Sequence, residues 1–277
     1  MAVTAQQVKQ LRDITNAGMM DCKKALEAAD GNMDEALKIL KEKGLADAKK
    51  RSDRENNEGG IYIAQASGNV AIAMIACETD FVANNDNFKN ACNDLVKKVV
   101  SVGSEKIEDF STDLVTVAQI TKENITMKKL RCIKLASDQY ASTYIHGNNK
   151  IGVVAVYKVS DIAVTSKDLF KEMANNVALH ITASAPLYLC QNDVPESDVA
   201  EQKALFEKQM EDTDKPKNII ENILNGKISK YKSEVSLLDQ KYIKDDKLSV
   251  QKYVEATAKT LDCQITISEF VRFNIGE

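Results

Sequence analysis

Residues 61–76 read IYIAQASGNVAIAMIA and determine the fold of the chain's centre. Two runs rich in strand-forming residues, Ile61–Ala64 and Val70–Ala76, flank Ala66-Ser67-Gly68-Asn69, a pattern typical of a β-hairpin. A helix is expected next, from about Asn87 to Val100, because apolar residues recur there at helical spacing. The stretch and its continuation therefore predict a ββα unit.

This unit is predicted to occur twice, because Ala141–Ile181 aligns with Gly59–Val99 at a constant shift of 82 residues. Repetition at a fixed shift indicates two copies of one structural unit, which would offer two docking surfaces on one body. The alignment pairs Tyr62 with Tyr144, Ile63 with Ile145, Ala73 with Ala155, Asp86 with Asp168 and Phe88 with Phe170.

Residues 1–45 predict a module of three short helices. Thr4 and Gln7 form a capping-box pattern before the first helix, and a similar pattern at Asn32 precedes the third. Asn16-Ala17-Gly18 is expected to separate the first two helices. A module of this size is better suited to docking one face on a partner than to catalysis.

Charged segments surround the predicted core. Residues 46–60 are expected to form a charged linker, which could be helical in part, because they carry many Lys, Arg, Asp and Glu residues and end with Gly59-Gly60. Between the two copies we expect a helix over Thr116–Asn124 and a third strand over Ile125–Ala136. The chain is expected to end with a helix over Val250–Ala258 and a strand over Ile265–Phe273.

A protruding antiparallel helical hairpin is predicted from Glu196–Met210 and Pro216–Tyr231, two charged, helix-prone segments separated by Asp212-Thr213-Asp214-Lys215-Pro216. Its seam is expected to consist of six apolar residues: Leu205, Phe206, Ile219, Ile220, Ile223 and Leu224.

The composition is that of an ordinary globular protein, with 277 residues, 44% hydrophobic residues and a net charge of -4. The six cysteines contain no CxxC pair and there are two histidines, so we expect neither a metal site nor a cofactor. The first 11 residues lack the apolar segment of a signal peptide, so we expect a cytoplasmic protein whose reduced cysteines are mostly core residues. No apolar stretch is long enough for a membrane span, and the mild acidity argues against direct nucleic-acid binding.

Two stretches carry a resemblance to a known family. Residues 11–26 read LRDITNAGMMDCKKAL, and residues 79–83 read TDFVA directly after the first hairpin. Both resemble signatures of the translation elongation factor Ts family. Further similar segments follow in order along the chain: Tyr144–Gly147, Ile151–Val153, His180–Ser184, Glu234–Leu238 and Phe270–Phe273.

The resemblance implies an α+β fold whose parts agree with those predicted above. These parts are a ubiquitin-associated-like helical module (1–45), the charged linker (46–60), core subdomain N (61–140), core subdomain C (141–193 and 233–277) and a coiled-coil hairpin (194–232).

The resemblance also implies a guanine nucleotide exchange factor that binds elongation factor Tu, both with GDP and free of nucleotide, and promotes GDP release. Such a factor performs no covalent catalysis, so no catalytic residue is expected. A two-to-two assembly with the partner is a further expectation.

Particular residues receive roles from the same resemblance. The segment that disturbs the Mg²⁺ on the partner's nucleotide corresponds to Thr79, Asp80, Phe81 and Val82. Docking on the partner's nucleotide-binding domain is expected from Arg12, Met19 and Met20, and contact with a different domain from His146 and Gly147. The residue types suit the task, because an exposed phenylalanine can wedge between partner helices while the neighbouring aspartate adds charge near the metal.

Two departures from the family pattern stand out. Asn16 occupies a position where the family usually has glycine, and asparagine tolerates a left-handed turn. The sequence ends at Glu277, where similar members often continue into a further helix.

The residues alone leave other interpretations open. Asp80 could cap a helix whose Phe81 lies in the core, and one of Met19 and Met20 is expected to be buried and the other exposed. His180 is expected to be a core histidine. Three competing functions are a Cys–His enzyme, a scaffold that only recruits partners, and nucleic-acid binding through Lys49–Arg54.

Overall fold

The predicted hairpin consists of strands β1 (Glu58–Ala66) and β2 (Asn69–Cys77) in the computed structural model, which describes residues 3–15, 17–210 and 216–277. The strands are antiparallel, and Tyr62 lies opposite Ala73. Ser67 and Gly68 form the turn with positive φ angles, a conformation that glycine adopts without strain. Strand β3 (Thr126–Lys134) pairs antiparallel with β2, which confirms the predicted third strand.

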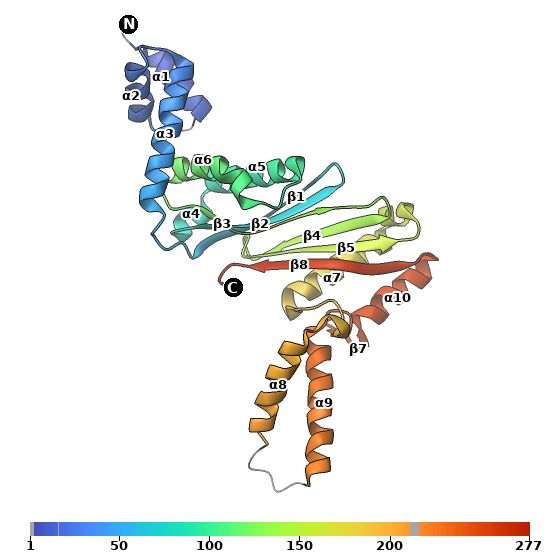
Figure 1. The fold of residues 1–277 in the computed structure, drawn as a ribbon. Helices are drawn as coiled ribbons and strands as arrows, with labels where there is room; N and C mark the ends of the chain where they lie inside the picture. The colour runs from blue at the N-terminus through green and yellow to red at the C-terminus, as the bar shows by residue number, and fades with distance from the viewer. Residues whose placement is uncertain (1–2, 16, 211–215) are drawn as a thin grey trace. The chain divides into compact units, whose positions relative to one another are not determined.

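Helices α5 (Asp86–Val102) and α6 (Ser111–Thr121) cover one face of this sheet, as Figure 1 shows. The α5 side chains at helical spacing fill the first core, among them the fully buried Phe88, Cys92 and Val96. Phe88 packs edge-on against Tyr62 with 6.2 Å between ring centroids, a favourable aromatic geometry. The short helix α4 (Asp80–Asn84) connects β2 to α5.

The predicted duplication is confirmed by the bounds of the elements. Strand β5 (Ile151–Val159) and helix α7 (Asp168–Ser184) repeat β2 and α5 at a shift of 82 residues at both ends. Strand β4 (Gln139–His146) takes the place of β1. With β8 (Ile265–Asn274) these strands form the second sheet, in the order β4-β5-β8. The fold class is therefore α+β, as predicted.

The repeat extends further than the sequence indicates. Helix α10 (Val250–Leu261) and strand β8 follow α7 in the same order in which α6 and β3 follow α5. The second copy differs because a long insertion separates α7 from α10. It contains helices η3 (Gln191–Asp193), α8 (Glu196–Lys208) and α9 (Lys217–Val235) and strands β6 (Lys241–Tyr242) and β7 (Asp245–Ser249). Two further short helices are η1 (Ile107–Phe110) and η2 (Ile162–Ser166).

The chain divides into two compact units. The first comprises Met1–Lys134 with Ile145–Gly152 and Phe273–Glu277, and the second comprises Leu135–Tyr144 with Val153–Arg272. The finer division of the chain into five sequence segments remains a prediction.

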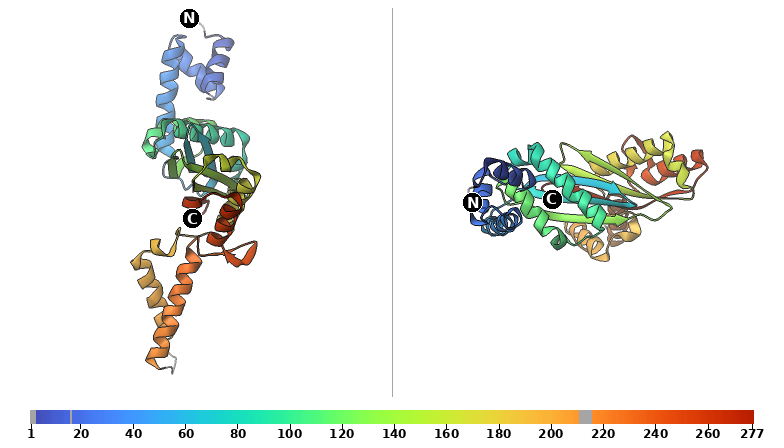
Figure 2. Two further views of the ribbon diagram at one scale, coloured as in Figure 1. Left: turned by 90° about the vertical axis from the view of Figure 1, so that its right-hand side faces the viewer. Right: turned by 90° about the horizontal axis from the view of Figure 1, so that it is seen from above.

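Helices α8 and α9 lie side by side and form the expected hairpin (Figure 2). The predicted seam is wrong at two positions, because Leu205 and Ile219 are 48% and 44% exposed. The other four predicted positions are covered: Leu224 is buried, and Phe206, Ile220 and Ile223 are half-buried. Met210, which the prediction did not include, is buried as well. Of the predicted separator 212–216, Pro216 precedes α9, and residues 212–215 lie outside the described residues.

Three helices form the N-terminal module: α1 (Ala5–Thr15), α2 (Met19–Ala28) and α3 (Met33–Arg51). The capping box is present, since Gln7 N donates to Thr4 Oγ1 (3.2 Å) and Thr4 N donates to Gln7 Oε1 (3.0 Å). Asn16 lies outside the described residues.

Helix α3 continues through the first part of the stretch that the sequence predicts as a linker. It packs on α6, where Gln119 Nε2 donates to Leu40 O at 2.9 Å and buried Gly44 leaves no room for a Cβ beside Gln119. This tertiary contact stabilises a charged helix that composition alone suggests to be a connector.

His180 is a core histidine, as predicted. It is fully buried, its Nε2 lies 2.8 Å from Gln240 Oε1, and its Nδ1 accepts a hydrogen bond from Ile243 N at 3.2 Å. A backbone N–H can only donate, so Nδ1 is unprotonated and Nε2–H donates to Gln240. Burial lowers the pKa of His180 and favours this neutral form.

The prediction that the cysteines are mostly core residues holds for three of six. Cys22, Cys77 and Cys92 are buried, whereas Cys132, Cys190 and Cys263 are half-buried, and all six are free thiols. Burial raises the pKa of Cys77 to about 12, which keeps this thiol protonated at neutral pH.

A glycine pair tests the first sheet. We expect Gly59→Ala to destabilise the protein by about 3 kcal/mol, because Gly59 has a φ of +134° and an added Cβ would lie 2.2 Å from Ile75 O. Gly226→Ala in α9 is the control, since nothing lies within 4 Å of its added Cβ, and should stabilise by about 0.5–1 kcal/mol. Urea unfolding followed by circular dichroism measures both; equal effects would contradict the packing of β1 on β2.

A second prediction concerns pH. Because the folded-state pKa of His180 is lowered, the unfolded chain alone gains this proton as the pH falls below about 6.5. Stability should therefore fall by up to about 1.4 kcal/mol per pH unit until the folded-state pKa is reached. The free energies of unfolding of wild type and His180→Gln, compared at pH 7.5 and 5.0, isolate this effect. An unchanged difference between the two proteins would show that His180 does not titrate as described.

Candidate functional site

Phe81 stands on the short helix α4 with 84% of its surface exposed. The residue that caps this helix is Thr79, whose Oγ1 accepts a hydrogen bond from Val82 N at 3.3 Å. Val82 and Ala83 turn inward and pack against the first core, while Asp80 is exposed. The alternative in which Asp80 is the cap and Phe81 a core residue is therefore wrong.

The side chain of Thr79 points inward rather than toward solvent. Its hydroxyl donates to Glu123 Oε1 at 2.6 Å, and its backbone N donates to Glu123 Oε2 at 3.1 Å. Cys77 Sγ donates to Thr79 O at 3.2 Å. Of the four residues predicted in this segment, Asp80 and Phe81 are thus presented on the surface, while Thr79 holds their turn in place.

His146 and Gly147 belong to the turn between β4 and β5, which lies in the same compact unit as α4. Asn148 Nδ2 donates to Asn84 Oδ1 at 2.6 Å, and Lys89 Nζ donates to Asn148 Oδ1 at 2.9 Å. Asn84 is the last residue of α4, so these bonds tie the turn to the helix that carries Phe81.

The turn itself has an unusual backbone. Gly147, Asn148 and Asn149 all have positive φ angles, of 61°, 54° and 66°. Asparagine is among the few non-glycine residues that adopt this region readily. Asn149 also exchanges two hydrogen bonds with Ile61, from Asn149 Nδ2 to Ile61 O (2.8 Å) and from Ile61 N to Asn149 O (2.7 Å). These contacts hold His146 and Gly147 exposed at the surface.

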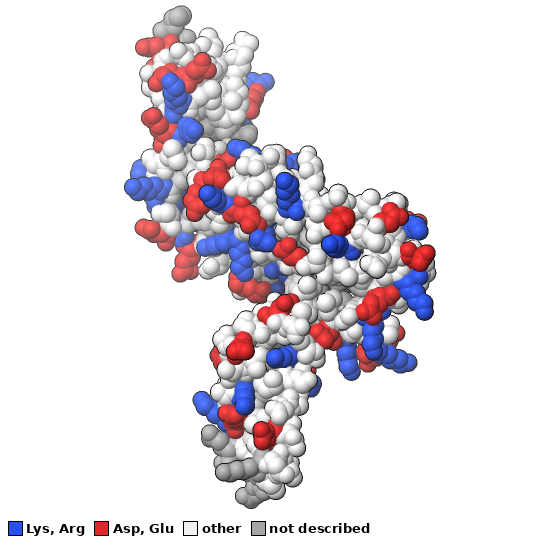
Figure 3. Space-filling view, turned by 45° about the vertical axis from the view of Figure 1, so that its right-hand side comes forward, with Lys and Arg blue, Asp and Glu red and all other residues white. Residues whose placement is uncertain are grey.

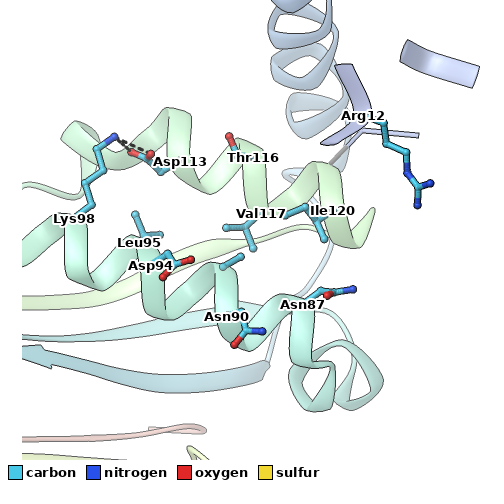
Figure 4. Close-up of a pocket in the computed structure, with 11 residues that line it drawn as sticks. Arg12, Asn87, Asn90, Asp94, Leu95, Lys98, Asp113, Thr116, Val117 and Ile120 are labelled. Atoms are coloured by element: carbon cyan, nitrogen blue, oxygen red, sulfur yellow. Dashed lines mark hydrogen bonds and ion pairs between the residues drawn. The ribbon is translucent and has the colours of Figure 1, made fainter. Parts of the chain in front are cut away.

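Arg12 lines a groove of about 670 Å³ between the module and helices α5 and α6. Figure 4 shows it extending from α1, with Asn87 of α5 on the opposite wall and the Lys98–Asp113 ion pair farther along the groove. Asn87 follows closely after α4 in the chain, so Arg12 faces the region where α4 joins α5.

Both Met19 and Met20 are exposed, by 48% and 63%, so the expectation that one is buried is wrong. They begin helix α2, and the module core is filled instead by residues from the next turns, Cys22 and Leu26. Short helices bury one narrow face, and neither methionine lies on it.

Asp21 connects the methionine end of the module to the core. It pairs with Lys43 at 2.5 Å and with Lys122 at 3.9 Å, and the Lys43 ammonium holds the pKa of Asp21 below its usual value. Lys122 ends α6 in a left-handed conformation and immediately precedes Glu123. The module is therefore connected to the N-terminal end of α4 through Lys122, which pairs with Asp21, and Glu123, which binds Thr79.

All nine predicted site residues lie in the first compact unit. The residues that connect them were missed by sequence reasoning: Asp21, Asn84, Lys122, Glu123 and Asn148. The pair Asn148-Asn149 after Gly147 carries a turn signal that could have been noticed. No local pattern points to Glu123.

Basic residues that could contact nucleic acid lie close to acidic ones. On the face shown in Figure 3, basic and acidic residues are interspersed. Within the basic stretch, Arg54 pairs with Glu78 (3.3 Å), Lys50 with Asp47 (3.8 Å), and Arg51 Nε donates to Asp47 O. Internal pairing of these cations disfavours RNA binding through Lys49–Arg54. Separately, none of the helices in the described ranges has the length and apolar character that crossing a membrane requires.

Comparison with known proteins identifies the family. The family model described as elongation factor TS matches residues 78–277. Elongation factor Ts of Borreliella burgdorferi is 40% identical over 276 residues, which cover 99% of this chain and 99% of that protein. The proteins of the same name from Treponema denticola and Borrelia duttonii are 39% and 38% identical, with at least 99% of each chain covered.

These relatives are translation elongation factors, and the chain that resembles them carries an exposed phenylalanine on a capped helix in the same compact unit as a three-helix module. It belongs to the elongation factor Ts family.

The tether between α4 and the β4–β5 turn can be tested by Asn148→Gly. Glycine tolerates the φ of +54°, so this change removes the bonds to Asn84 and Lys89 without adding backbone strain. We expect a loss of about 1 kcal/mol in the free energy of unfolding, measured in urea, because exposed hydrogen bonds contribute little individually. Asn84→Ala should cause a similar loss, and the double variant should be no worse than either; additive losses would contradict the bond between them.

Proposed function

We propose that this chain is a guanine nucleotide exchange factor that binds elongation factor Tu with GDP or free of nucleotide. It promotes GDP release by disturbing the Mg²⁺ and phosphate site of the partner, and so supports translation elongation in the cytoplasm. The observation that carries the proposal is the 84% exposed Phe81 in a chain of the elongation factor Ts family.

The mechanism requires no covalent chemistry. GDP is held by backbone amides that cradle its phosphates and by a bridging Mg²⁺, and an exchange factor has only to bind the nucleotide-free partner better than the GDP form. Phe81 enters between partner helices and shifts the elements that hold the metal, while exposed Asp80 places a carboxylate near them. Linkage then requires GDP to weaken binding of the factor as much as the factor weakens binding of GDP.

A comparison of free energies indicates that contacts other than Phe81 are needed to release the nucleotide. Burying a phenylalanine side chain contributes about 1.5–3 kcal/mol. A nucleotide bound with a Kd of about 1 nM has about 12 kcal/mol of binding free energy. Burial of Phe81 by itself cannot offset this binding free energy of the nucleotide. Other contacts of the factor must therefore also favour the nucleotide-free partner.

The module and the β4–β5 turn supply these contacts in our proposal. Exposed Arg12, Met19 and Met20 dock on the nucleotide-binding domain, while His146 and Gly147 touch a different domain of the partner. Thr79 and Val82 shape the turn that presents Phe81. A two-to-two assembly of factor and partner is part of the same proposal.

The geometry offers little for the competing enzyme function. Both ring nitrogens of His180 are engaged inside the core, so this histidine has no open site for a substrate. Burial keeps the Cys77 thiol protonated. A scaffold that only recruits partners would have no use for an exposed aromatic residue on a capped turn beside the docking module.

The central test is Phe81→Ala. Wild type should accelerate release of a fluorescent GDP analogue from elongation factor Tu, and Phe81→Ala should lower the maximal rate about tenfold or more, because the wedge is lost (about 1.4 kcal/mol per factor of ten). Folding should be unaffected, since the side chain is exposed.

The matched control is Ile162→Ala. Ile162 is 47% exposed and lies in η2, between β5 and α7, where the second copy has its counterpart of α4. We expect Ile162→Ala to give the same maximal rate of GDP-analogue release as wild type. If Phe81→Ala also equals wild type, the wedge assignment fails; if wild type does not accelerate release, the exchange function fails.

A further inference from the structure

The carboxylate of Glu123 lies directly at the first turn of α4. We propose that Glu123 is a positioning residue for exchange, which aims Phe81 by holding the N-terminal end of α4. The inference rests on the proposed function and adds a residue to it that does not itself touch the partner's nucleotide site.

Glu123 accepts three hydrogen bonds from the two residues that precede α4. Its Oε2 accepts from Glu78 N at 2.9 Å and from Thr79 N at 3.1 Å, and its Oε1 accepts from Thr79 Oγ1 at 2.6 Å. Hydrogen bonds to an ionised acceptor are shorter and stronger than neutral ones. Two backbone amides and one hydroxyl are thereby fixed by a single half-buried side chain.

Thr79 links Glu123 to the backbone of helix α4. Its hydroxyl donates to Glu123 and, with a remaining lone pair, accepts from Val82 N, the residue after Phe81. Its carbonyl accepts from Ala83 N at 3.1 Å. The backbone on both sides of Phe81 is therefore set by the rotamer of Thr79, and that rotamer by Glu123.

Glu123 is itself held in place by its neighbours. Lys122 ends α6 with a φ of 64°, and Asn124 N donates to Glu78 Oε1 at 2.6 Å. Asn124 Nδ2 also donates to Arg54 O at 2.7 Å. Glu78 and Glu123 thus form a reciprocal clamp between the end of β2 and the end of α6, in which each carboxylate accepts from the other segment's backbone.

Phe81 depends on this clamp because its own side chain is almost free of packing. At 84% exposure the ring is not aimed by core contacts, so its direction follows from the backbone of residues 79–84. The far end of α4 is tied by Asn84 to Asn148, and the near end by Thr79 to Glu123. A displacement of about 1 Å at a site of this kind can cost up to about a hundredfold in rate.

The experiment compares Glu123→Ala and Glu123→Gln with wild type in GDP-analogue release from elongation factor Tu, over a range of factor concentrations. Glu123→Ala should lower the maximal rate about tenfold while the half-saturating concentration changes less than about threefold, because the module and the β4–β5 turn still dock. The maximal rate of Glu123→Gln, which keeps an acceptor oxygen, should lie between those of wild type and Glu123→Ala. A loss of folding would instead lower the active fraction, which circular dichroism and titration with the partner detect.

Two comparisons separate positioning from a general structural role. In the Phe81→Ala background, Glu123→Ala should cause no further loss, because it acts through Phe81. Thr79→Val, which removes the hydroxyl that joins Glu123 to Val82 N, should lower the maximal rate as Glu123→Ala does. The matched control is Glu105→Ala, since Glu105 also accepts from a backbone amide, Cys132 N at 2.9 Å, but at a site away from α4. It should leave the maximal rate unchanged.

The outcomes are distinct. Multiplicative losses in the double variant, a wild-type rate for Glu123→Ala, or an equal loss in Glu105→Ala would each overturn the positioning role while leaving the exchange function in place. Failure of the wild-type protein to accelerate release would overturn the proposed function, and the positioning role with it.

Discussion

The packing of one amphipathic helix on one β-hairpin supports the whole structure. In the first unit α5 buries Phe88 edge-on against Tyr62, and in the second α7 buries Phe170 against Tyr140 and Tyr157. Because both ends of the connection between strand and helix are held by this core, the few residues between them can present side chains to solvent without unfolding. The exposed aromatic turn at Phe81 lies in such a connection.

The two copies cap the turn between strand and helix in a similar way but differ in the side chain that the turn exposes. The second copy caps the corresponding turn with Asp161, whose side chain accepts from Ala163 N at 2.9 Å, much as Thr79 caps α4. Val164 is buried there, and Val82 is packed in the first copy. At the shift of 82 residues, however, Ala163 stands where the first copy has Phe81. The duplicated scaffold is retained, while the aromatic side chain and its support by Glu123 belong to the first copy.

Where sequence reasoning failed, long-range packing was the cause. Helix α3 extends to Arg51 because Gly44 and Leu40 meet Gln119 of α6, a contact that charge composition cannot indicate. Both methionines of the module are exposed because the narrow buried face of α2 begins at Cys22. Leu205 and Ile219 of the predicted hairpin seam are exposed, since helical spacing identifies an apolar stripe but not the partner helix that covers it.

The sequence by itself predicted most local elements, the duplication and the family, and it singled out Phe81, whose side chain the structure shows to be exposed. Hairpin turns, helix caps and apolar periodicity act over a few residues, so they can be recognised without knowing the fold. Only the tertiary structure decided that Thr79 turns inward to Glu123, 44 positions away, and that Asn84 meets Asn148, 64 positions away. A polar side chain finds its partner through the juxtaposition of distant segments, and no local pattern encodes that juxtaposition.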